Sequence, residues 1–444
     1  MSPTIEQHWK PAQIKLTILA FIAFMWDPSH RSVRLRLPFG ALLCSGSDRT
    51  GTANRMLSVN RVATIAACEE HLGSIERGTD GRLLLASNLK YAHCGGAASL
   101  LQVINTWSRS VAETDSILLT HAQAQFAEQT IANLVETLPG LVSVLMSAQV
   151  MARDGHTSML ATAYETARQR IEAMDAGRFR DTARGTATTL LCADQTTKRA
   201  LQPLYHTTAN GGAHVRGESD FVDLARDLMT AALGDARKLD FDFKDVEAVG
   251  VMLRELFANT HYHARTDATG RPYRRSVRGV HFAQHALEEH EKVSGGFPPF
   301  EEYLASVIAR PRRAARAKLL EISVFDSGPG YAARMAGRPI DENVTLEREY
   351  ELVRNCLLRN VSTRTQDGAG IGLPRMLSRL KGRGGFVRLR TGRLSLFRSF
   401  AGEDDTALLD TDYDLEDAGA AAVGFTRHAP AAGSVVTLLF PIGR

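Results

Sequence analysis

Apolar positions in the first part of the chain follow the spacing of a strand and then of a helix. Residues 81–86 form a nearly continuous apolar run, which predicts a buried strand. Residues 97–107 carry apolar side chains at the spacing of one helix face, and a Gly-containing turn separates the two stretches. A strand, a tight loop and an apolar-faced helix make an α/β unit, so we predict an α/β domain here.

Four further patterns fill the remainder of the first 209 residues. Residues 32–38 alternate as a strand does, and residues 63–72 have the pattern of a short helix. Residues 120–178 are rich in alanine and contain few helix breakers, which predicts a mostly helical region. Residues 186–192 predict another strand, because they are rich in β-branched and apolar residues.

The second half of the chain alternates helical and strand patterns again. The predicted helices are at 221–233, 243–257, 346–358 and 373–380, and the predicted strands are at 319–326 and 433–441. A Gly-Gly turn near residue 210 marks the boundary between the halves. We therefore predict an N-terminal α/β domain at 1–119, a mostly helical connecting or dimerisation region at 120–209, and a second α/β domain at 210–444. A chain of 444 residues accommodates this number of domains.

A polar stripe continues the helix predicted from residue 243. Glu255, Asn259 and His263 stand four residues apart, so their side chains project from one helix face. A carboxylate, an amide and an imidazole placed in this way can meet a metal ion and a phosphate together. The alternative is a solvated polar face, which surface helices commonly carry.

Two Gly-rich stretches and a final strand follow this helix. The strand predicted at 319–326 leads directly into Asp-Ser-Gly-Pro-Gly at 326–330. Asp-Gly-Ala-Gly-Ile-Gly-Leu at 367–373 precedes a helix, and Gly-Ser-Val-Val-Thr-Leu-Leu-Phe-Pro occupies 433–441. With the E-x-x-x-N spacing of Glu255 and Asn259, these stretches resemble the GHKL ATPase superfamily. That superfamily includes gyrase-type topoisomerases, a class of heat-shock chaperones, mismatch-repair ATPases and sensor histidine kinases.

The resemblance covers roughly half of the chain, from about residue 215 to the last residue, and implies a two-layer α/β sandwich of the GHKL, or Bergerat, type. It also implies a site for ATP and Mg²⁺. Asn259 is implied as the metal ligand. Glu255 is implied as the catalytic group, which activates water in hydrolysing members and assists phosphoryl transfer in histidine kinases.

Asp326 is implied to accept a hydrogen bond from the adenine amino group. Gly328 and Gly330 would let the backbone approach the base closely, because they have no Cβ. The alternative for Asp326 is an Asx turn after the strand. His263 could reach a phosphate, or it could be satisfied within its own helix.

The second Gly-rich stretch is implied to hold the phosphates. Gly368, Gly370 and Gly372 precede a helix, so successive N–H groups would point at the phosphates. Ile371 and Leu373 belong to the same turn. Arg364, in the region expected to form a lid, is a cation candidate for the terminal phosphate or an exposed loop arginine.

Two features disfavour the kinase subgroup. No phenylalanine lies between Tyr331 and Gln366, and no upstream histidine has the surroundings of a phosphoacceptor; His121 matches poorly. We therefore expect ATP hydrolysis that drives a lid-closing regulatory switch acting on the N-terminal half or on a protein partner. A protein kinase, acting on histidine or on serine, and a non-catalytic ATP-binding module are the alternatives. The N-terminal half resembles STAS-like domains only faintly, over residues 81–107.

Composition and charge narrow these classes only slightly. A net charge of +4 gives no indication of a nucleic-acid-binding surface. The five cysteines are dispersed without metal-ligand spacing, which favours reduced thiols and a cytoplasmic location. Residues 14–26 are almost wholly apolar but too few for a membrane-spanning helix of about 20 residues. We expect a buried helix or strand there, with a leader as the alternative. The helical region at 120–209 could also form a homodimer.

Overall fold

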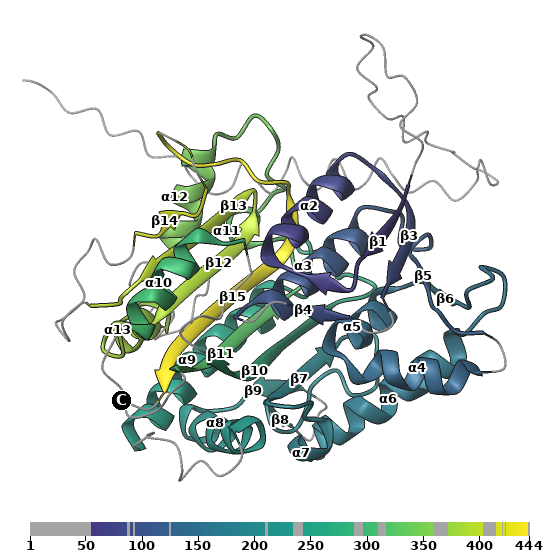
Figure 1. The fold of residues 1–444 in the computed structure, drawn as a ribbon, viewed down its shortest axis with the longest axis horizontal. Coiled ribbons are helices and arrows are strands. Elements are labelled where there is room, and N and C mark those ends of the chain that lie inside the picture. The colour runs from purple at the N-terminus through teal and green to yellow at the C-terminus, as the bar shows by residue number, and fades with distance from the viewer. Residues whose placement is uncertain are drawn as a thin grey trace, which may run out of the picture. The chain divides into compact units, whose positions relative to one another are not determined.

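Seven strands form the larger of the two main sheets in the computed structural model, and all neighbouring pairs in it are antiparallel (Figure 1). Their order across the sheet is β14-β13-β12-β15-β11-β10-β7. The strands are β7 (Ala187–Ala193), β10 (Val277–Leu287), β11 (Ala317–Asp326), β12 (Phe386–Gly392), β13 (Leu394–Ser399), β14 (Glu416–Asp417) and β15 (Ala431–Ile442). The long strands β10, β11 and β15 lie at the centre, where both faces are covered.

A smaller, parallel sheet precedes it in the chain, with the order β1-β3-β5-β6. Parallel neighbours need crossover connections, and helices supply most of them here. The strands are β1 (Arg55–Val59), β3 (Thr79–Leu85), β5 (Ile117–Leu119) and β6 (Gln149–Met151). The helices of this part are α2 (Ile65–Glu76), α3 (Gly96–Arg109), α4 (Ala127–Glu136), α5 (Leu138–Met146), α6 (Leu160–Asp175) and α7 (Phe179–Thr182).

The remaining helices belong to the second half, and two short pairs of strands complete the fold. The helices are α8 (Glu218–Leu233), α9 (Phe243–His263), α10 (Pro298–Ile308), α11 (Tyr331–Ala336), α12 (Leu346–Leu357) and α13 (Gly372–Lys381). The short strand pairs are β2 (Val62–Ala63) with β4 (Lys90–Tyr91), and β8 (Tyr205–Thr207) with β9 (Ala213–Val215). The mixed α/β class expected from the sequence is confirmed.

The structure describes residues 55–86, 89–91, 94–123, 126–208, 212–233, 243–287, 296–309, 317–357, 372–402, 414–419, 421 and 423–442. The strand predicted at 32–38 and the apolar run at 14–26 lie outside these ranges. Residues 53–444 form one compact unit, in which β7 completes the large sheet. The three-part division at 119 and 209 stays a prediction.

The two faces of the large sheet differ in chemistry. Neighbouring residues on a strand point to opposite faces, so each row across the sheet belongs to one face. One row is apolar, and the next row is polar although it is equally buried. The apolar row is Val280, Val324, Val436 and Leu389, and the polar row is His281, Ser323, Thr437 and Arg388.

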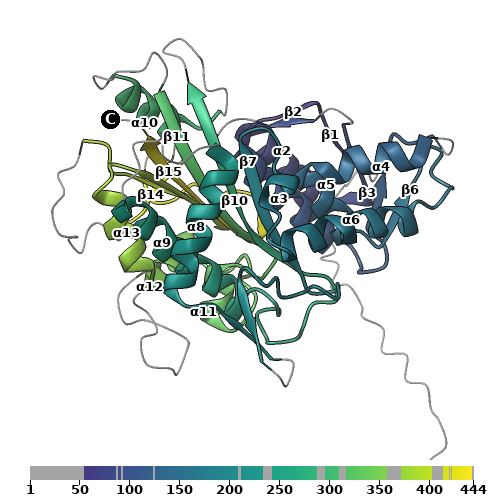
Figure 2. The same ribbon diagram turned by 90° about the horizontal axis from the view of Figure 1, so that it is seen from below.

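Helices cover both faces. Met376 and Leu377 of α13 meet Val436 on the apolar face, and α13 packs against α9, which also contacts β10 and β11 (Figure 2). On the polar face, Gly95 at the start of α3 lies against Thr437. Helix α3 packs along β15 and β11 on this face (Figure 1). The large sheet is thus enclosed between α9 with α13 on one side and α3 on the other.

Gly433, at the start of β15, occupies a position that no other residue fits. Its φ is +74°, and a Cβ built on it would stand 1.9 Å from the carbonyl oxygen of Asp326. Gly155 has a similar φ of +73°, but nothing lies within 4 Å of a Cβ there. Alanine substitutions at these two glycines therefore allow the cost of backbone strain to be separated from the cost of steric overlap.

We predict that Gly433→Ala lowers the free energy of unfolding by about 2–4 kcal/mol, because strain and overlap act together. Gly155→Ala should cost only about 1 kcal/mol, the strain of a left-handed alanine. Urea denaturation of both variants measures the difference. Equal losses in the two variants would show that the backbone at Gly433 moves away without cost.

Candidate functional site

Three of the four stretches singled out in the sequence lie together: the helix with the polar stripe, the stretch at 326–330 and the final strand. Helix α9 packs on β11, α13 packs on α9, and β11 pairs with β15. Ala264, just after α9, lies close to Gly328, because a Cβ on Gly328 would be 2.6 Å from the Cα of Ala264. The fold therefore brings together residues that are separated by more than one hundred positions in the chain.

The polar stripe lies on α9, as predicted. Glu255, Asn259 and His263 are each partly exposed, between buried apolar residues of the same helix. Glu255 forms an ion pair with its neighbour Arg254. The carboxylate is therefore accompanied by a cation on the same partly exposed surface, which offsets its charge.

Asp326 ends β11 and is 8% exposed. Its Oδ1 accepts a hydrogen bond of 2.8 Å from the N–H of Gly328, and the N–H of Ser434 also donates to the carboxylate. The bond to Gly328 forms the Asx turn that was the alternative interpretation. A carboxylate has about four acceptor positions, so this turn does not exhaust it. Burial raises the pKa of Asp326 to about 6 despite these hydrogen bonds.

Hydroxyl groups continue the row that begins at Asp326. Ser434 on β15 follows it across the sheet, and the hydroxyl of Ser434 lies 3.2 Å from that of Thr391 on β12. Because strand side chains repeat every second residue, this row faces the same side as Val436 and Leu389. Thr391 and Ser434 were not predicted as site residues, although Ser434 falls within the final strand motif.

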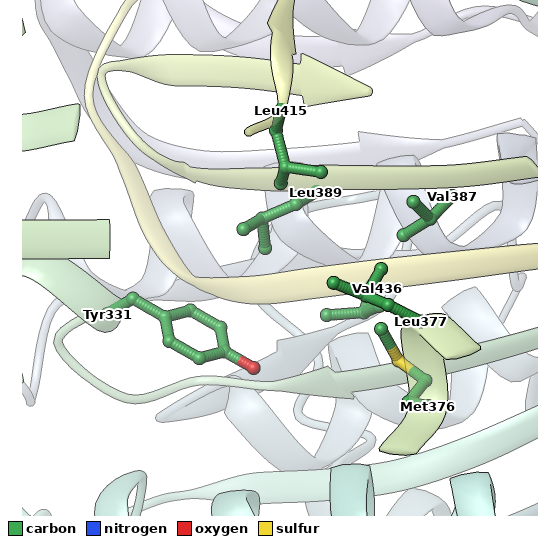
Figure 3. Close-up of a pocket in the computed structure, with 7 residues that line it drawn as sticks. All are labelled: Tyr331, Met376, Leu377, Val387, Leu389, Leu415 and Val436. Atoms are coloured by element: carbon green, nitrogen blue, oxygen red, sulfur yellow. The ribbon is translucent and has the colours of Figure 1, made fainter. Parts of the chain in front are cut away.

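A small apolar cavity lies beside this row (Figure 3). Seven residues line it: Tyr331, Met376, Leu377, Val387, Leu389, Leu415 and Val436. Its volume of about 10 Å³ holds at most about one water molecule. A purine base would fit only if lining side chains moved apart. Sequence reasoning missed this cavity, because its residues come from α11, α13, β12, β15 and residue 415.

The glycines after Asp326 have packing reasons of their own. Ala264 takes up the space in which a Cβ of Gly328 would stand. Gly330 has a φ of +87°, and a Cβ there would lie 2.8 Å from the hydroxyl oxygen of Thr391. Both positions therefore require glycine without any ligand. Their predicted role in approaching a base stays a prediction.

The phosphate-binding half of the predicted site is only partly described. Arg364, Gly368, Gly370 and Ile371 lie outside the described residues. Gly372 begins α13 and Leu373 follows it in the helix, as the sequence predicted. The side chain of Leu373 lies outside the described part of the structure.

A second polar network adjoins the site on the α9 side and was not predicted. Arg278 pairs with Asp326 in the register of β10 and β11, and its guanidinium bonds Asp194 at 2.8 Å and the hydroxyl of Tyr205 at 3.0 Å. Tyr205 in turn lies 3.1 Å from the ring nitrogen Nδ1 of His261 on α9. The network ties α9 to the sheet next to the carboxylate of Asp326.

The described part of the chain holds neither a metal-ligand cluster nor a membrane-spanning helix. No group of three or more His, Cys, Asp or Glu side chains in these ranges could hold a metal ion. No helix in them is long and apolar enough to cross a membrane.

Comparison with known proteins does not assign the chain to a group. No protein-family model, curated protein or solved structure matched it. The candidate site therefore stands on the residues and geometry described above.

Asp326 gives a pH-dependent prediction. Its pKa of about 6 lies above the value of about 3.9 expected in an unfolded chain, so the folded state holds the proton more tightly. The contribution of Asp326 to the free energy of unfolding is therefore largest below pH 4. It falls by about 3 kcal/mol as the pH rises through 6.

Asp326→Asn removes the titrating group, and we expect it to lack this part of the pH dependence. Urea denaturation of parent and variant between pH 4 and pH 8 measures the two curves. Parallel curves would mean that Asp326 does not titrate differently in the folded and unfolded states.

Proposed function

We propose that this chain binds Mg²⁺–ATP in a site of the GHKL, or Bergerat, type and hydrolyses the ATP. The observation that carries the proposal is a buried carboxylate, Asp326, at the end of a central strand and beside an apolar cavity. A carboxylate there can accept hydrogen bonds from the amino group of adenine, while apolar side chains cover the ring. Guanine presents a carbonyl at the same position, which the carboxylate would repel.

The helices around Asp326 support the phosphate end of the proposal. Helix α13 begins within the Gly-rich stretch, and its N-terminus offers N–H groups and the positive end of the helix dipole. Because α13 packs on α9, this helix start belongs to the same cluster of elements as the polar stripe. One bound nucleotide would then place its phosphates at the N-terminus of α13 and its base near Asp326.

Asn259 is the proposed protein ligand of Mg²⁺. Mg²⁺ keeps several waters and is often held by substrate phosphates with few protein ligands, so one protein oxygen can complete its coordination. A neutral amide oxygen suits such a position. The bound ion would supply charge neutralisation for the phosphates during their transfer.

Glu255 is the proposed general base. It lies one helical turn before Asn259, so the carboxylate is placed to accept a proton from a water held beyond the phosphates. The ion pair with Arg254 orients the carboxylate and places a cation on the same surface. We propose that ATP closes a lid between Gly330 and Gly368, and that ATP hydrolysis drives this switch, which acts on the N-terminal half or on a protein partner.

The metal assignment predicts a selective loss in Asn259→Ala. The variant should keep its fold, because the side chain is partly exposed, and should lose the gain in ATP affinity that Mg²⁺ provides. Calorimetric titration with ATP, with and without Mg²⁺, measures this gain. Asn133→Ala, at an exposed position on α4, serves as the matched control and should behave as the parent does. An unchanged Mg²⁺ dependence in Asn259→Ala would remove Asn259 from the site.

The base assignment predicts a loss of turnover without loss of binding in Glu255→Ala. Turnover should fall by about 10²- to 10⁴-fold, the usual contribution of a positioned general base. ATP affinity should stay within a few-fold of the parent or increase, because Arg254 is released from its ion pair. Glu247→Ala, two turns earlier on α9, should retain turnover.

Single-turnover reactions with γ-labelled ATP decide between the proposed hydrolase and its alternatives. Free labelled phosphate from the parent supports hydrolysis. Labelled protein would instead identify a protein kinase, and intact bound ATP would identify a binding module. Equal turnover in the Glu255 and Glu247 variants would contradict the base assignment.

A further inference from the structure

Helix α3 carries a polar stripe on the side that faces the large sheet. Gln102, Asn105, Thr106 and Arg109 stand at positions i, i+3, i+4 and i+7, which places them on one helix face. The first three are buried, and Arg109 is partly buried. A solvated polar face is thus not the explanation for this stripe.

Every member of the stripe bonds the backbone at the ends of the strands around Asp326. Gln102 Nε2 donates to the carbonyl of Arg390 at 3.0 Å, and Asn105 Nδ2 donates to the carbonyl of Asp326 at 3.2 Å. Thr106 accepts from the N–H of Ala432 at 2.9 Å, and Arg109 donates to the carbonyl of Ser327 at 3.2 Å. These bonds reach β11, β12 and β15 from the face opposite the cavity.

Asn105 is a poor choice if packing alone is considered. The residue is fully buried, and its Oδ1 has no hydrogen-bond partner among the described residues. An unsatisfied buried acceptor costs about 1–3 kcal/mol, and an apolar side chain of similar size would avoid this cost. The residue is better explained by the one bond that it does make, to the carbonyl of Asp326.

We propose that Asn105 is a positioning residue for Asp326 and that α3 couples the parallel sheet to the nucleotide site. This inference rests on the proposed function, because it assigns Asp326 the recognition of the base. The bond from Asn105 fixes the carbonyl of Asp326, and the two N–H donors at Gly328 and Ser434 fix its carboxylate. Asp326 is therefore held through its backbone carbonyl from the α3 side of the sheet and through its carboxylate by these two N–H groups.

The coupling has a thermodynamic consequence. A base bound at Asp326 stabilises the strand ends to which α3 is bonded, so nucleotide should also stabilise the docking of α3. By linkage, any ligand or partner that shifts α3 changes nucleotide affinity by the same factor. The N-terminal parallel sheet contacts α3 through β3. A ligand or partner that binds this sheet and moves α3 would then change nucleotide affinity.

The test compares Asn105→Ala with Ser108→Ala. Ser108 lies on the same helix, is also buried, and bonds the carbonyl of Met146 on α5 instead of the strand ends. Hydrogen exchange of residues 324–335 is measured without nucleotide, and ATP and GTP affinities are measured by calorimetry. Asp326→Asn provides the reference for complete loss of base selection.

We expect Asn105→Ala, and not Ser108→Ala, to accelerate exchange in 324–335 and to lower the ATP-to-GTP preference by about five- to ten-fold, the value of one hydrogen bond. Unchanged exchange overturns the inference whatever the nucleotides do. Faster exchange with an unaltered preference also overturns it. Faster exchange in a protein whose parent binds no ATP leaves α3 as the support of the Asp326 loop but removes the proposed function.

Asn105→Asp provides a second variant if Asn105→Ala does not fold. It keeps the shape of the side chain and makes the donor depend on protonation. Relative to the parent at each pH, exchange in 324–335 should be near normal when the new carboxyl is neutral and faster when it is ionised. A ratio that does not change with pH would mean that the donor at residue 105 does not hold the loop.

Discussion

The burial of α3 between two sheets is the constraint on which the other elements depend. Residues 96–108 of this helix are all buried, although several of them are polar. One side packs on α2, α5 and β3, where Trp107 donates to the carbonyl of Gly81. The other side lies on β15 and β11. Because a single helix serves both sheets, a change in its position is transmitted to each of them.

Charged groups secure the same interface at two places. At the start of α3, the N–H of Gly95 donates to the carboxylate of Glu321, which also bonds His285 at 2.7 Å. A helix N-terminus is a favourable place for a buried carboxylate. On α2, Glu69 pairs with the buried Arg388 and Arg390 of β12, and these partners keep the pKa of Glu69 well below its usual range despite burial.

Such buried pairs contribute little net stability, because both charges lose their hydration. They are, however, costly to misalign, since a shifted register would leave a charge without a partner. The polar layer between α3 and the sheet therefore specifies where the helix docks more than how tightly it binds. Apolar contacts elsewhere in the core, such as those of Leu100, Leu101 and Ile104, provide the free energy that holds α3 in place.

Much of the local structure could be predicted from the sequence, since it follows from short-range patterns. The apolar spacing in 97–107 predicted α3, and the alternating run before Asp326 predicted β11. The polar stripe on α3 could not be interpreted in this way, because polar residues on an amphipathic helix are expected to face water. Its partners at the strand ends lie 218 to 331 residues later, and no local pattern reports on them.

The packing role of Gly328 was missed for a related reason. Glycine after a strand is compatible with a turn, a ligand or a close contact, and only the position of Ala264 shows which of these is present. The final strand motif, in contrast, predicted β15 well. Its apolar run is a local pattern, whereas its pairing with both β11 and β12 is a property of the whole sheet.

The chemistry of the α3 stripe also matters while the protein is being made. At about 5–20 residues per second, the 331 residues between Gln102 and Gly433 take roughly 17–66 s to synthesise. Until β15 is made, α3 has only α2, α5, the parallel sheet and the earlier strands to pack on, and the side that faces β15 is not covered by it. An apolar surface there would attract other unfinished chains. Amide, hydroxyl and guanidinium groups can be hydrated until the last strand is made. The nascent chain therefore exposes a hydrated polar surface there, which does not promote aggregation as an apolar surface would.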